Sequence, residues 1–593
     1  MNRARTPVAS LLALTLLLGP AAYGQPKPLP DPLRATLQKK GYTAVPLLKD
    51  AHRLQFTIDC KSGTEAFRLD LDTGADSSSL DTALVKKLGL KPGDEVESVG
   101  IGGAHKTHEI SLRGMSIGDF DTRTMANALP LRSGDYSKVN VDRKDRQAQG
   151  LLGDGALRMS SAVIDYSGRA LYLRTPLRSL WPEIAGTWVA TGGREEGRER
   201  KIDAKAPPKL EFKDNRFHLT DGANQHTFGV HVRPEEHRST LVFFDPEREF
   251  AEELGYKAGG LMKVSDGKLT VCLCLDLTKA KKGDEFPDDF EAEAGSGHLL
   301  LEFRREKPAE RPVAVADPLR AALVKKGYTA VPLVEMGDKG FVVECQCGTE
   351  KLRLLLDTGA EISALDKGFV QKLGLKPQND VTAFGFGGSL EGVGVSLRGL
   401  RIGDFDTRTT IKSLDVAAFD FTAINTALTR HLKLKPIDGL LGHWDLEIFS
   451  AVIDYSTRTL YLRTPLQSLW PSIEGKWVAT HIHDDGQERP LDPKAPLKLE
   501  LKENRFHLTD GVGDVNFGMH VRSDKGVHTL LFFDPEKELD KELGYSTSGL
   551  LKVAGDKLTV CLSLGGATNT GIPDDFKAPA KSGRLLVEFR REK

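Results

Sequence analysis

The sequence predicts a mainly β protein in which a two-domain unit occurs twice in tandem. Segments recur in the same order in both halves of the 593-residue chain. The first part of each copy combines short apolar runs with Gly-rich turns, and the second part alternates apolar and polar residues. Such alternation is typical of strands with one buried face. A chain of this length is also too long for a single hydrophobic core.

The repeat is a duplication without rearrangement. The peptide Leu-Asp-Thr-Gly-Ala occurs at 71–75 and again at 356–360, so that its two aspartates, Asp72 and Asp357, lie 285 positions apart. A later Phe-Phe-Asp-Pro segment, beginning at Phe243, recurs 289 positions further on. The copies therefore differ by small insertions only. Two copies at so long a period do not form a solenoid.

The first 25 residues predict a secretory signal peptide. Two arginines precede an apolar run from Val8 to Leu18, and small residues follow it, which places the mature N-terminus near Gln25. The run is short for a membrane span, although an uncleaved signal anchor is the alternative. No later segment is apolar enough to be transmembrane. We therefore expect an exported protein, either periplasmic or secreted.

Pro-containing stretches mark the expected domain boundaries. After the signal peptide at 1–25, we expect a first Gly-rich domain at 31–176, a first alternating-pattern domain at 181–307, a linker at 308–316, a second Gly-rich domain at 317–465 and a second alternating-pattern domain at 470–593.

Charge and cysteine content exclude several classes of protein. The chain has 82 basic and 83 acidic side chains, which gives no electrostatic case for nucleic acid. Its six cysteines are too sparse for a disulfide-based fold, and their spacing does not supply four zinc ligands. We expect buried free thiols. His481, His483 and Asp484 do not complete a metal shell and are interpreted as a solvated turn, so no metal or cofactor is expected.

Each Asp-Thr-Gly lies where a strand-like apolar run turns into a loop. A helix is expected near 81–88 in the first copy, followed by a Gly-rich segment of hairpin length. An apolar Gly-Leu-Leu-Gly element comes later, at 150–153 and at 439–442. The tripeptide alone is weak evidence, because it occurs by chance in roughly one in ten chains of this length. Its occurrence twice, in the same surroundings, makes it specific.

This order of elements resembles the retropepsin-like aspartic proteases, in particular the exported bacterial branch with an Asp-Thr-Gly-Ala motif. The resemblance covers about residues 31–176 and 317–465, and it implies that Asp72 and Asp357 are catalytic. It also implies loop-bracing roles for Thr73, Gly74, Thr358 and Gly359, and two flaps made of Gly100, Ile101, Gly102 and Gly103 and of Gly385, Phe386, Gly387 and Gly388. The Gly-Leu-Leu-Gly elements would be the strands that pass behind the catalytic loops.

One retropepsin-like lobe carries a single Asp, so activity requires two lobes to pair. Two carboxylates about 3 Å apart share one proton, and the ionised member can then take a proton from a bound water. Tethering favours pairing of the two lobes within one chain, and a homodimer is the alternative. The motif ends in Ala75 and Ala360 rather than Ser. Without a hydroxyl at these positions, we expect the aspartates to titrate at higher pH.

The second domain of each copy resembles a bacterial lipocalin-like family. The resemblance rests on Gly186-Thr-Trp188 and Gly475-Lys-Trp477, on the repeated Lys-Leu-Thr-Val-Cys-Leu, and on the terminal Glu-Phe-Arg-Arg-Glu-Lys. It implies an antiparallel barrel closed at one end by an indole. A ligand- or partner-binding role and a purely structural role both remain open.

The fold expected from these resemblances is mainly β, with two retropepsin-like acid-protease lobes alternating with two antiparallel lipocalin-like β-barrel domains. The function expected is that of an aspartic endopeptidase acting on a peptide or protein substrate. The alternative is a non-catalytic, exported peptide- or ligand-binding protein built on protease-like lobes.

Overall fold

The computed structural model describes most of the chain after the N-terminal segment. The described residues are 32–49, 55–100, 103–124, 129–137, 149–176, 180, 184–213, 216–222, 224–234, 239–244, 256–265, 267–274, 287, 289–306, 317–337, 339–385, 388–407, 414–502, 505–509, 513–524, 527–533, 545–563 and 573–592. The expected signal peptide at 1–25 and linker at 308–316 lie outside them. No helix among the described residues is long and apolar enough to cross a membrane.

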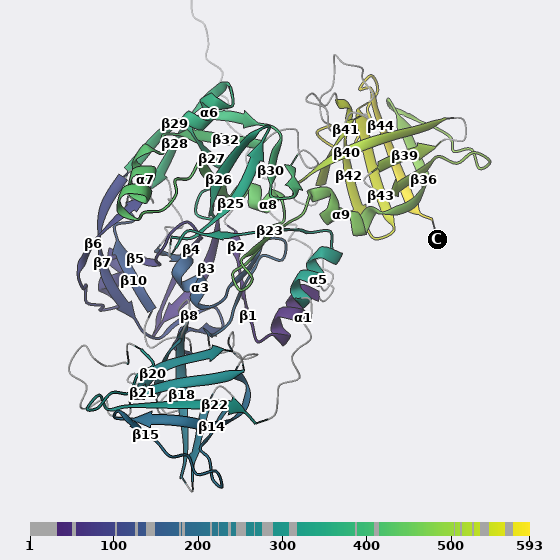
Figure 1. Cartoon of the computed structure of the whole chain (residues 1–593). Coiled ribbons are helices and arrows are strands. Elements are labelled where there is room, and N and C mark those ends of the chain that lie inside the picture. The colour runs from purple at the N-terminus through teal and green to yellow at the C-terminus, as the bar shows by residue number, and fades with distance from the viewer. Residues whose placement is uncertain are drawn as a thin grey trace, which may run out of the picture.

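The chain is mainly β, as the sequence predicts, and forms two similar lobes and two barrels (Figure 1). Lobe 1 comprises α1 (Pro32–Lys39), β1 (Thr43–Pro46), β2 (Leu48–Lys49), β3 (Phe56–Ser62), β4 (Glu65–Asp72), β5 (Ser79–Asp81), α2 (Thr82–Lys87), β6 (Glu95–Gly100), β7 (Gly103–Leu112), β8 (Met115–Ile117), β9 (Phe120–Asp121), β10 (Leu129–Gly134), β11 (Gly150–Gly153), α3 (Asp154–Met159), β12 (Val163–Asp165) and β13 (Ala170–Leu173).

Lobe 2 repeats this order. It comprises α5 (Pro318–Lys325), β23 (Thr329–Pro332), β24 (Val334–Glu335), β25 (Phe341–Cys347), β26 (Glu350–Asp357), β27 (Ala364–Asp366), α6 (Lys367–Lys372), β28 (Pro377–Gly385), β29 (Gly388–Leu397), β30 (Leu400–Ile402), β31 (Phe405–Asp406), β32 (Leu414–Phe419), α7 (Thr422–Thr426), β33 (Gly439–Gly442), α8 (His443–Ile448), β34 (Val452–Asp454) and β35 (Thr459–Leu462).

The helix expected near 81–88 is present in both lobes, because the same sequence signal starts it. The Asp81 carboxylate accepts a hydrogen bond from the Ala83 amide and caps α2, and Asp366 caps α6 in the same way through Gly368. Such a cap satisfies an amide that the first helical turn leaves free.

The two lobes share one six-stranded sheet, in the order β1-β13-β12-β34-β35-β23. Its central pair is β12 with β34, antiparallel, with Ile164 opposite Ile453. Helices α1 and α5 lie side by side next to this sheet (Figure 1). Each lobe thus supplies half of the sheet that joins them.

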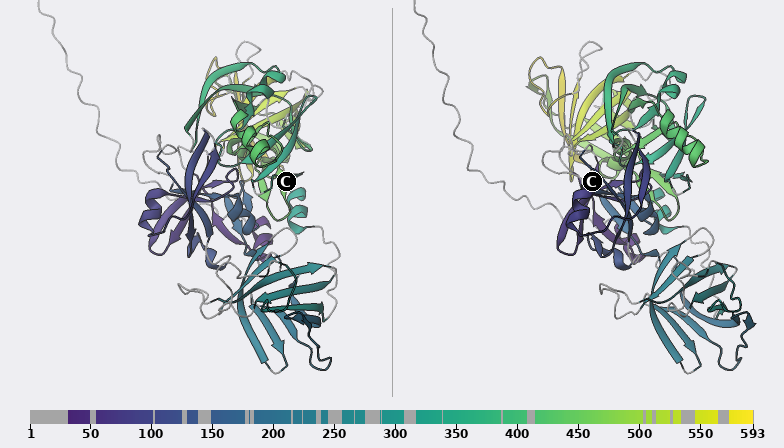
Figure 2. Two further views of the ribbon diagram at one scale, coloured as in Figure 1. Left: turned by 60° about the vertical axis from the view of Figure 1, so that its left-hand side comes forward. Right: turned by 90° about the vertical axis from the view of Figure 1, so that its left-hand side faces the viewer.

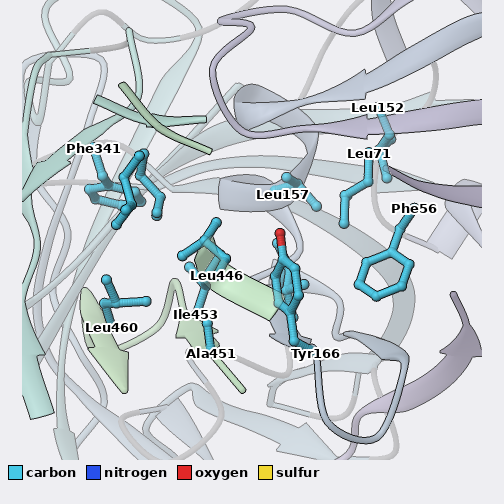
Figure 3. Packing of buried hydrophobic residues seen from close by; sticks show 14 of the residues in the cluster. Phe56, Leu71, Leu152, Leu157, Tyr166, Phe341, Leu446, Ala451, Ile453 and Leu460 are labelled. Carbon is cyan, nitrogen blue, oxygen red and sulfur yellow. The ribbon is translucent and has the colours of Figure 1, made fainter. Parts of the chain in front are cut away.

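The hydrophobic core continues from one lobe into the other. A single cluster of buried residues includes Phe56, Leu71 and Tyr166 from lobe 1 and Phe341 and Ile453 from lobe 2 (Figure 3). Burial of so much shared apolar surface is the main force that holds two such lobes together.

Each barrel is an antiparallel sheet closed on itself. Barrel 1 contains β14 (Gly186–Glu195), β15 (Arg198–Glu199), β16 (Lys209–Lys213), β17 (Arg216–Asp221), β18 (Asn224–Pro234), β19 (Ser239–Phe244), β20 (Tyr256–Ser265), β21 (Lys268–Cys274) and β22 (His298–Arg305), and closes by pairing β14 with β22. Barrel 2 contains β36 (Gly475–Asp484), β37 (Gln487–Glu488), β38 (Lys498–Lys502), β39 (Arg505–Thr509), β40 (Asp514–Asp524), β41 (Val527–Phe533), β42 (Tyr545–Ala554), β43 (Lys557–Ser563) and β44 (Arg584–Arg591), and closes by pairing β36 with β44.

A buried indole lies near one end of each barrel. Trp188 Nε1 donates to the Ile184 carbonyl at 2.8 Å, and the Arg305 guanidinium lies over its ring. Trp477 and Arg591 repeat this arrangement in barrel 2, where helix α9 (Pro465–Ile473) packs at the same place. The guanidinium thus covers one face of a ring whose polar atom is already bonded.

Both barrels lie outside the pair of lobes, barrel 1 below lobe 1 and barrel 2 beside lobe 2 in Figure 1, and the two views of Figure 2 agree. Barrel 1 intervenes in sequence between the lobes and does not separate them in space. All six cysteines are free and buried, which confirms the expectation from their composition.

Candidate active site

The two Asp-Thr-Gly motifs occupy equivalent strand ends. Asp72 is the last residue of β4, which runs parallel to β11 with Gly153 opposite Asp72. Asp357 is the last residue of β26, which runs parallel to β33 with Gly442 opposite Asp357. All four residues of each Gly-Leu-Leu-Gly strand are buried. These strands therefore form the apolar backing that the resemblance implied.

Glycine is required at the end of that backing strand. A Cβ atom on Gly153 would lie 2.7 Å from the Ser77 carbonyl carbon, well inside contact distance. The Gly153 amide also donates to the Ser78 hydroxyl at 2.9 Å, as Gly442 does to Ser363. The loop that follows the motif is thereby fixed from behind.

The two carboxylates are held by backbone amides of their own loops. Asp72 Oδ1 accepts from Gly74 N at 2.9 Å and Ala75 N at 3.1 Å. Asp357 Oδ1 accepts from Gly359 N at 2.9 Å and Ala360 N at 3.0 Å. Two amide donors on one oxygen fix each carboxylate in one orientation and favour its charged form.

The carboxylates of Asp72 and Asp357 face each other across the two motifs. A Cβ atom on Gly74 would lie 2.5 Å from Asp357 Cγ, and one on Gly359 would collide with the Asp72 carboxyl group in the same way. Each carboxylate thus lies against the glycine of the opposite lobe. Glycine permits this close approach because it has no Cβ.

Thr73 and Thr358 connect the two loops by four hydrogen bonds. Thr73 N donates to Thr358 Oγ1 at 2.9 Å, and Thr358 N donates to Thr73 Oγ1 at 3.0 Å. The Thr73 hydroxyl donates to the Leu356 carbonyl at 2.8 Å, and the Thr358 hydroxyl to the Leu71 carbonyl at 2.9 Å. Both side chains are buried. This network fixes the separation of the aspartates that precede the threonines.

Burial and mutual repulsion raise the pKa of this pair. Burial is the largest effect on Asp72, and the adjacent Asp357 carboxylate raises its pKa further. Burial also raises the pKa of Asp357, and the two backbone amides partly oppose this. The pair therefore titrates as a unit and retains one proton to higher pH than an isolated Asp.

The residues behind the two aspartates differ between lobes. Asp154, after Gly153, is buried beside Arg158, and burial raises its pKa to about 6. The equivalent residue in lobe 2 is His443, whose Nδ1 lies 3.4 Å from the Tyr166 hydroxyl. Burial lowers the pKa of His443 to about 3, so its ring is neutral at ordinary pH. The two halves of the site are therefore chemically distinct one layer behind the carboxylates.

The expected flap residues lie at the tips of two hairpins. Gly100 pairs with Gly103 where β6 meets β7, and Gly385 pairs with Gly388 where β28 meets β29. The four tip residues, Ile101, Gly102, Phe386 and Gly387, lie outside the described residues. Each lobe thus has one such hairpin, and the assignment of these hairpins as flaps stays a prediction.

No group of three or more His, Cys, Asp or Glu side chains within the described parts of the chain could hold a metal ion. His481 instead lies 3.5 Å from Glu588, and Asp484 pairs with Arg489.

The family model of aspartyl proteases matches the chain twice, over residues 56–154 and 343–443. These two segments contain both motifs and both backing strands. The chain thus contains two segments, one in each lobe, that match the aspartyl-protease family. Comparison with functionally characterised proteins gives no match at the level of sequence.

Several solved structures are similar to parts of this chain. The aspartic proteinase from Irpex lacteus is 10% identical, covers 71% of this chain and 97% of its own, with a TM-score of 0.28. A retropepsin-like aspartic protease from Rickettsia conorii is 23% identical, covers 23% of this chain and 98% of its own, with a TM-score of 0.17. Conglutin gamma, a basic 7S globulin from lupine seeds, is 9% identical, covers 72% of this chain and 96% of its own, with a TM-score of 0.26.

Several residues that shape the site were not predicted from the sequence. Gln55 donates from its side-chain amide to the Gly359 carbonyl of the opposite lobe. Tyr166 and Tyr455 are buried, and the charges of Asp357 and Asp72, respectively, help to raise the pKa of their hydroxyls. The two tyrosines belong to the repeated Val-Ile-Asp-Tyr-Ser segment, which was visible in the sequence. Gln55 carried no such signal, because the equivalent residue in the other copy is Gly340.

Proposed function

We propose that the duplicated protease is an aspartic endopeptidase with one active site per chain, formed by Asp72 and Asp357. The observation that carries the proposal is the packing of each carboxylate against the glycine of the opposite motif, with both raised in pKa by burial. Two such groups with one shared proton are a general base and a general acid in one place.

In the reaction, a water lies between the two carboxyl groups. The ionised carboxylate takes one proton from that water, and the resulting nucleophile attacks the scissile carbonyl carbon. The protonated carboxyl group donates its proton to the carbonyl oxygen as the tetrahedral intermediate forms. The carboxyl group that took the water proton passes it to the amide nitrogen, and the C–N bond breaks. A hydroxyl proton of the tetrahedral intermediate goes to the other carboxylate, so that one shared proton remains on the pair. Gly385 and Gly388, and their counterparts Gly100 and Gly103, close hairpins that we assign as flaps over the bound peptide.

Incubation of the mature full-length chain with a denatured protein or a peptide library tests this function. We expect internal peptide-bond cleavage that a statine-type inhibitor blocks, because such an inhibitor presents a hydroxyl group where the attacked carbonyl carbon lies. Binding of peptide without turnover, unaffected by the inhibitor, would instead identify a non-catalytic binding protein.

Export is part of the same proposal, because the predicted signal peptide precedes the first lobe. N-terminal sequencing of the protein recovered outside the cytoplasm should give a start near Gln25. A chain that retains Met1 in its final location would contradict cleavage.

The pH dependence of cleavage depends on the residue after each Asp-Thr-Gly. Ala75 and Ala360 give each carboxylate a backbone amide and no hydroxyl. The double variant Ala75→Ser with Ala360→Ser adds two donors that favour the charged carboxylates, so we expect the pKa of the pair to fall and the activity profile to move to lower pH. The measurement is kcat/KM against pH for both proteins, and superimposable profiles would refute the explanation.

A further inference from the structure

Several contacts between the lobes use residues that are identical in the two copies. Thr73 and Thr358 form reciprocal bonds, and the central strands of the shared sheet place Ile164 opposite Ile453. Such contacts form equally well between lobe 1 and lobe 2, between two copies of lobe 1, or between two copies of lobe 2. They cannot determine which lobes pair.

Two ion pairs across the interface break this equivalence. Arg158 Nη1 of lobe 1 lies 2.8 Å from Glu335 Oε1 of lobe 2. Lys49 Nζ of lobe 1 lies 2.6 Å from Glu447 Oε2 of lobe 2. In these two pairs lobe 1 supplies both cations and lobe 2 supplies both anions. A separate contact, from Lys339 Nζ of lobe 2 to Asp76 Oδ2 of lobe 1 at 2.7 Å, has the opposite polarity.

The pairs Lys49–Glu447 and Arg158–Glu335 occupy equivalent positions with reversed charge. Lys49 ends the segment Thr-Ala-Val-Pro-Leu-Leu-Lys, and Glu335 ends the matching Thr-Ala-Val-Pro-Leu-Val-Glu. Arg158 and Glu447 both lie five residues after the last glycine of Gly-Leu-Leu-Gly. The two-fold relation between the lobes maps one pair onto the other.

Pairing of like lobes would therefore bring like charges together twice. In a pair of lobe 1 copies, each Lys49 would face an Arg158. In a pair of lobe 2 copies, each Glu335 would face a Glu447. Like charges placed across an interface disfavour the wrong partner strongly, whereas the unlike pair satisfies both contacts.

Partial burial strengthens the discrimination. The four side chains of the two pairs are between 22% and 36% exposed. Arg158 is further fixed by lobe 2, since its Nη2 donates to the Gly340 carbonyl at 2.9 Å and its guanidinium lies 4.1 Å from the centre of the Phe341 ring. Partly desolvated, geometrically fixed charges are screened less by salt than exposed ones.

Another ion pair between the lobes does not select. Lys40 of lobe 1 pairs with Asp317 of lobe 2, but the equivalent positions in the other copies are Lys326 and Asp31, with the same charges. This pair would form in every combination of lobes, as the threonine bonds would.

We propose that the reversed ion pairs Lys49–Glu447 and Arg158–Glu335 are a pairing code, which makes lobe 2 the partner of lobe 1 and excludes assemblies of like lobes. The tether then selects the lobe 2 of the same chain, since it raises the local concentration of that partner to about the millimolar range. The chain is consequently a monomer with one Asp72–Asp357 pair.

The code makes an unusual prediction for single charge reversals. Glu447→Lys creates repulsion from Lys49 within the chain. It also makes lobe 2 complementary to itself, since the lysine introduced at position 447 of one copy would face Glu335 of the other. Lys49→Glu does the same for lobe 1, because the introduced glutamate would face Arg158 of a second copy. We expect both variants of the full chain to show a mean mass that rises with concentration toward twice that of the monomer in analytical ultracentrifugation.

The double variant Lys49→Glu with Glu447→Lys restores attraction within the chain and is expected to return to the monomer. Lys106→Glu is the matched control, because Lys106 pairs with Glu95 inside lobe 1 and is 75% exposed. It should remain monomeric.

The readout is mass and unfolding temperature, so it does not depend on protease activity. Single reversals that stay monomeric would overturn the code. A lower unfolding temperature without dimers would show only that the ion pairs stabilise the fold, and not that they select the partner lobe. A double variant as dimeric as the single ones would overturn it as well. If the chain cleaves no peptide but its reversals dimerise, the code stands and only the proposed function fails.

Discussion

Replacing Asp72 or Asp357 with Asn is expected to reduce kcat/KM by roughly 10²–10⁴-fold, the range for loss of one general acid or base. The asparagine side chain is nearly isosteric with Asp and keeps an oxygen for the amides of the following Gly and Ala. It cannot take a proton from water, so the shared proton no longer has two carboxylates to move between. The measurement is peptide cleavage at saturating and subsaturating substrate.

Both single variants should lose activity to a similar degree, because one site uses both residues. Asp59→Asn is the control, since Asp59 is an exposed carboxylate of lobe 1 that pairs with Arg68. A variant that retains half of the wild-type rate would indicate two independent sites. Wild-type rates in both variants would remove the aspartates from the chemistry.

The same variants should change how stability depends on pH. Because the pKa of each aspartate is raised in the folded chain, the folded state binds more protons than the unfolded state above the ordinary pKa of Asp. Stability from this pair is therefore greatest at low pH and is lost as pH rises through the folded pKa. Asp72→Asn removes part of that loss. We therefore expect the unfolding temperature of the variant, relative to that of the wild type, to increase as the pH rises.

The fold class was predictable because the duplication displayed each signal twice. Alternating apolar residues predicted the strands of both barrels, and Asp81 predicted the start of helix α2. The family model and the fold support the duplicated protease, whereas the lipocalin-like resemblance of the barrels, the domain boundaries and the exported location remain predictions.

The arrangement of the lobes was less accessible to sequence reasoning. A repeated Val-Ile-Asp segment indicates a strand, but not that β12 and β34 pair with each other to form one sheet from two lobes. Close approach at Gly74 and Gly359 likewise depends on the docking of lobes that are 285 residues apart in sequence. Residues that differ between copies, such as Gln55 and Gly340, acquire meaning only once that docking is known.

Loss of the hydrogen bonds between Thr73 and Thr358 is expected to destabilise the chain strongly. Thr73→Val removes a hydroxyl that donates to the Leu356 carbonyl and accepts from Thr358 N, without changing the size of the side chain. A buried amide and a buried carbonyl of lobe 2 then lose their partners, at about 1–3 kcal/mol each, or about 2–6 kcal/mol per substitution. Thr358→Val should cost as much, because its bonds to lobe 1 are the mirror image.

Thr122→Val is a matched control within lobe 1. Thr122 is equally buried, and its hydroxyl donates at 2.6 Å to the Met115 carbonyl of the same lobe. Thr122→Val leaves only the Met115 carbonyl without its partner, which lowers the free energy of unfolding by about 1–3 kcal/mol. The contact between the lobes stays intact. The measurement is chemical denaturation of Thr73→Val, Thr358→Val and Thr122→Val, with kcat measured on the same samples. It separates loss of stability from loss of carboxylate positioning.

The decisive comparison is between stability and activity. Thr73→Val should lower kcat as well as the midpoint of unfolding, because the network that it breaks also sets the separation of Asp72 and Asp357. Thr122→Val should lower the midpoint only, and Thr73→Ser, which keeps the hydroxyl, should recover both. Equal losses of kcat in Thr73→Val and Thr122→Val would show that the threonines stabilise the fold without positioning the carboxylates.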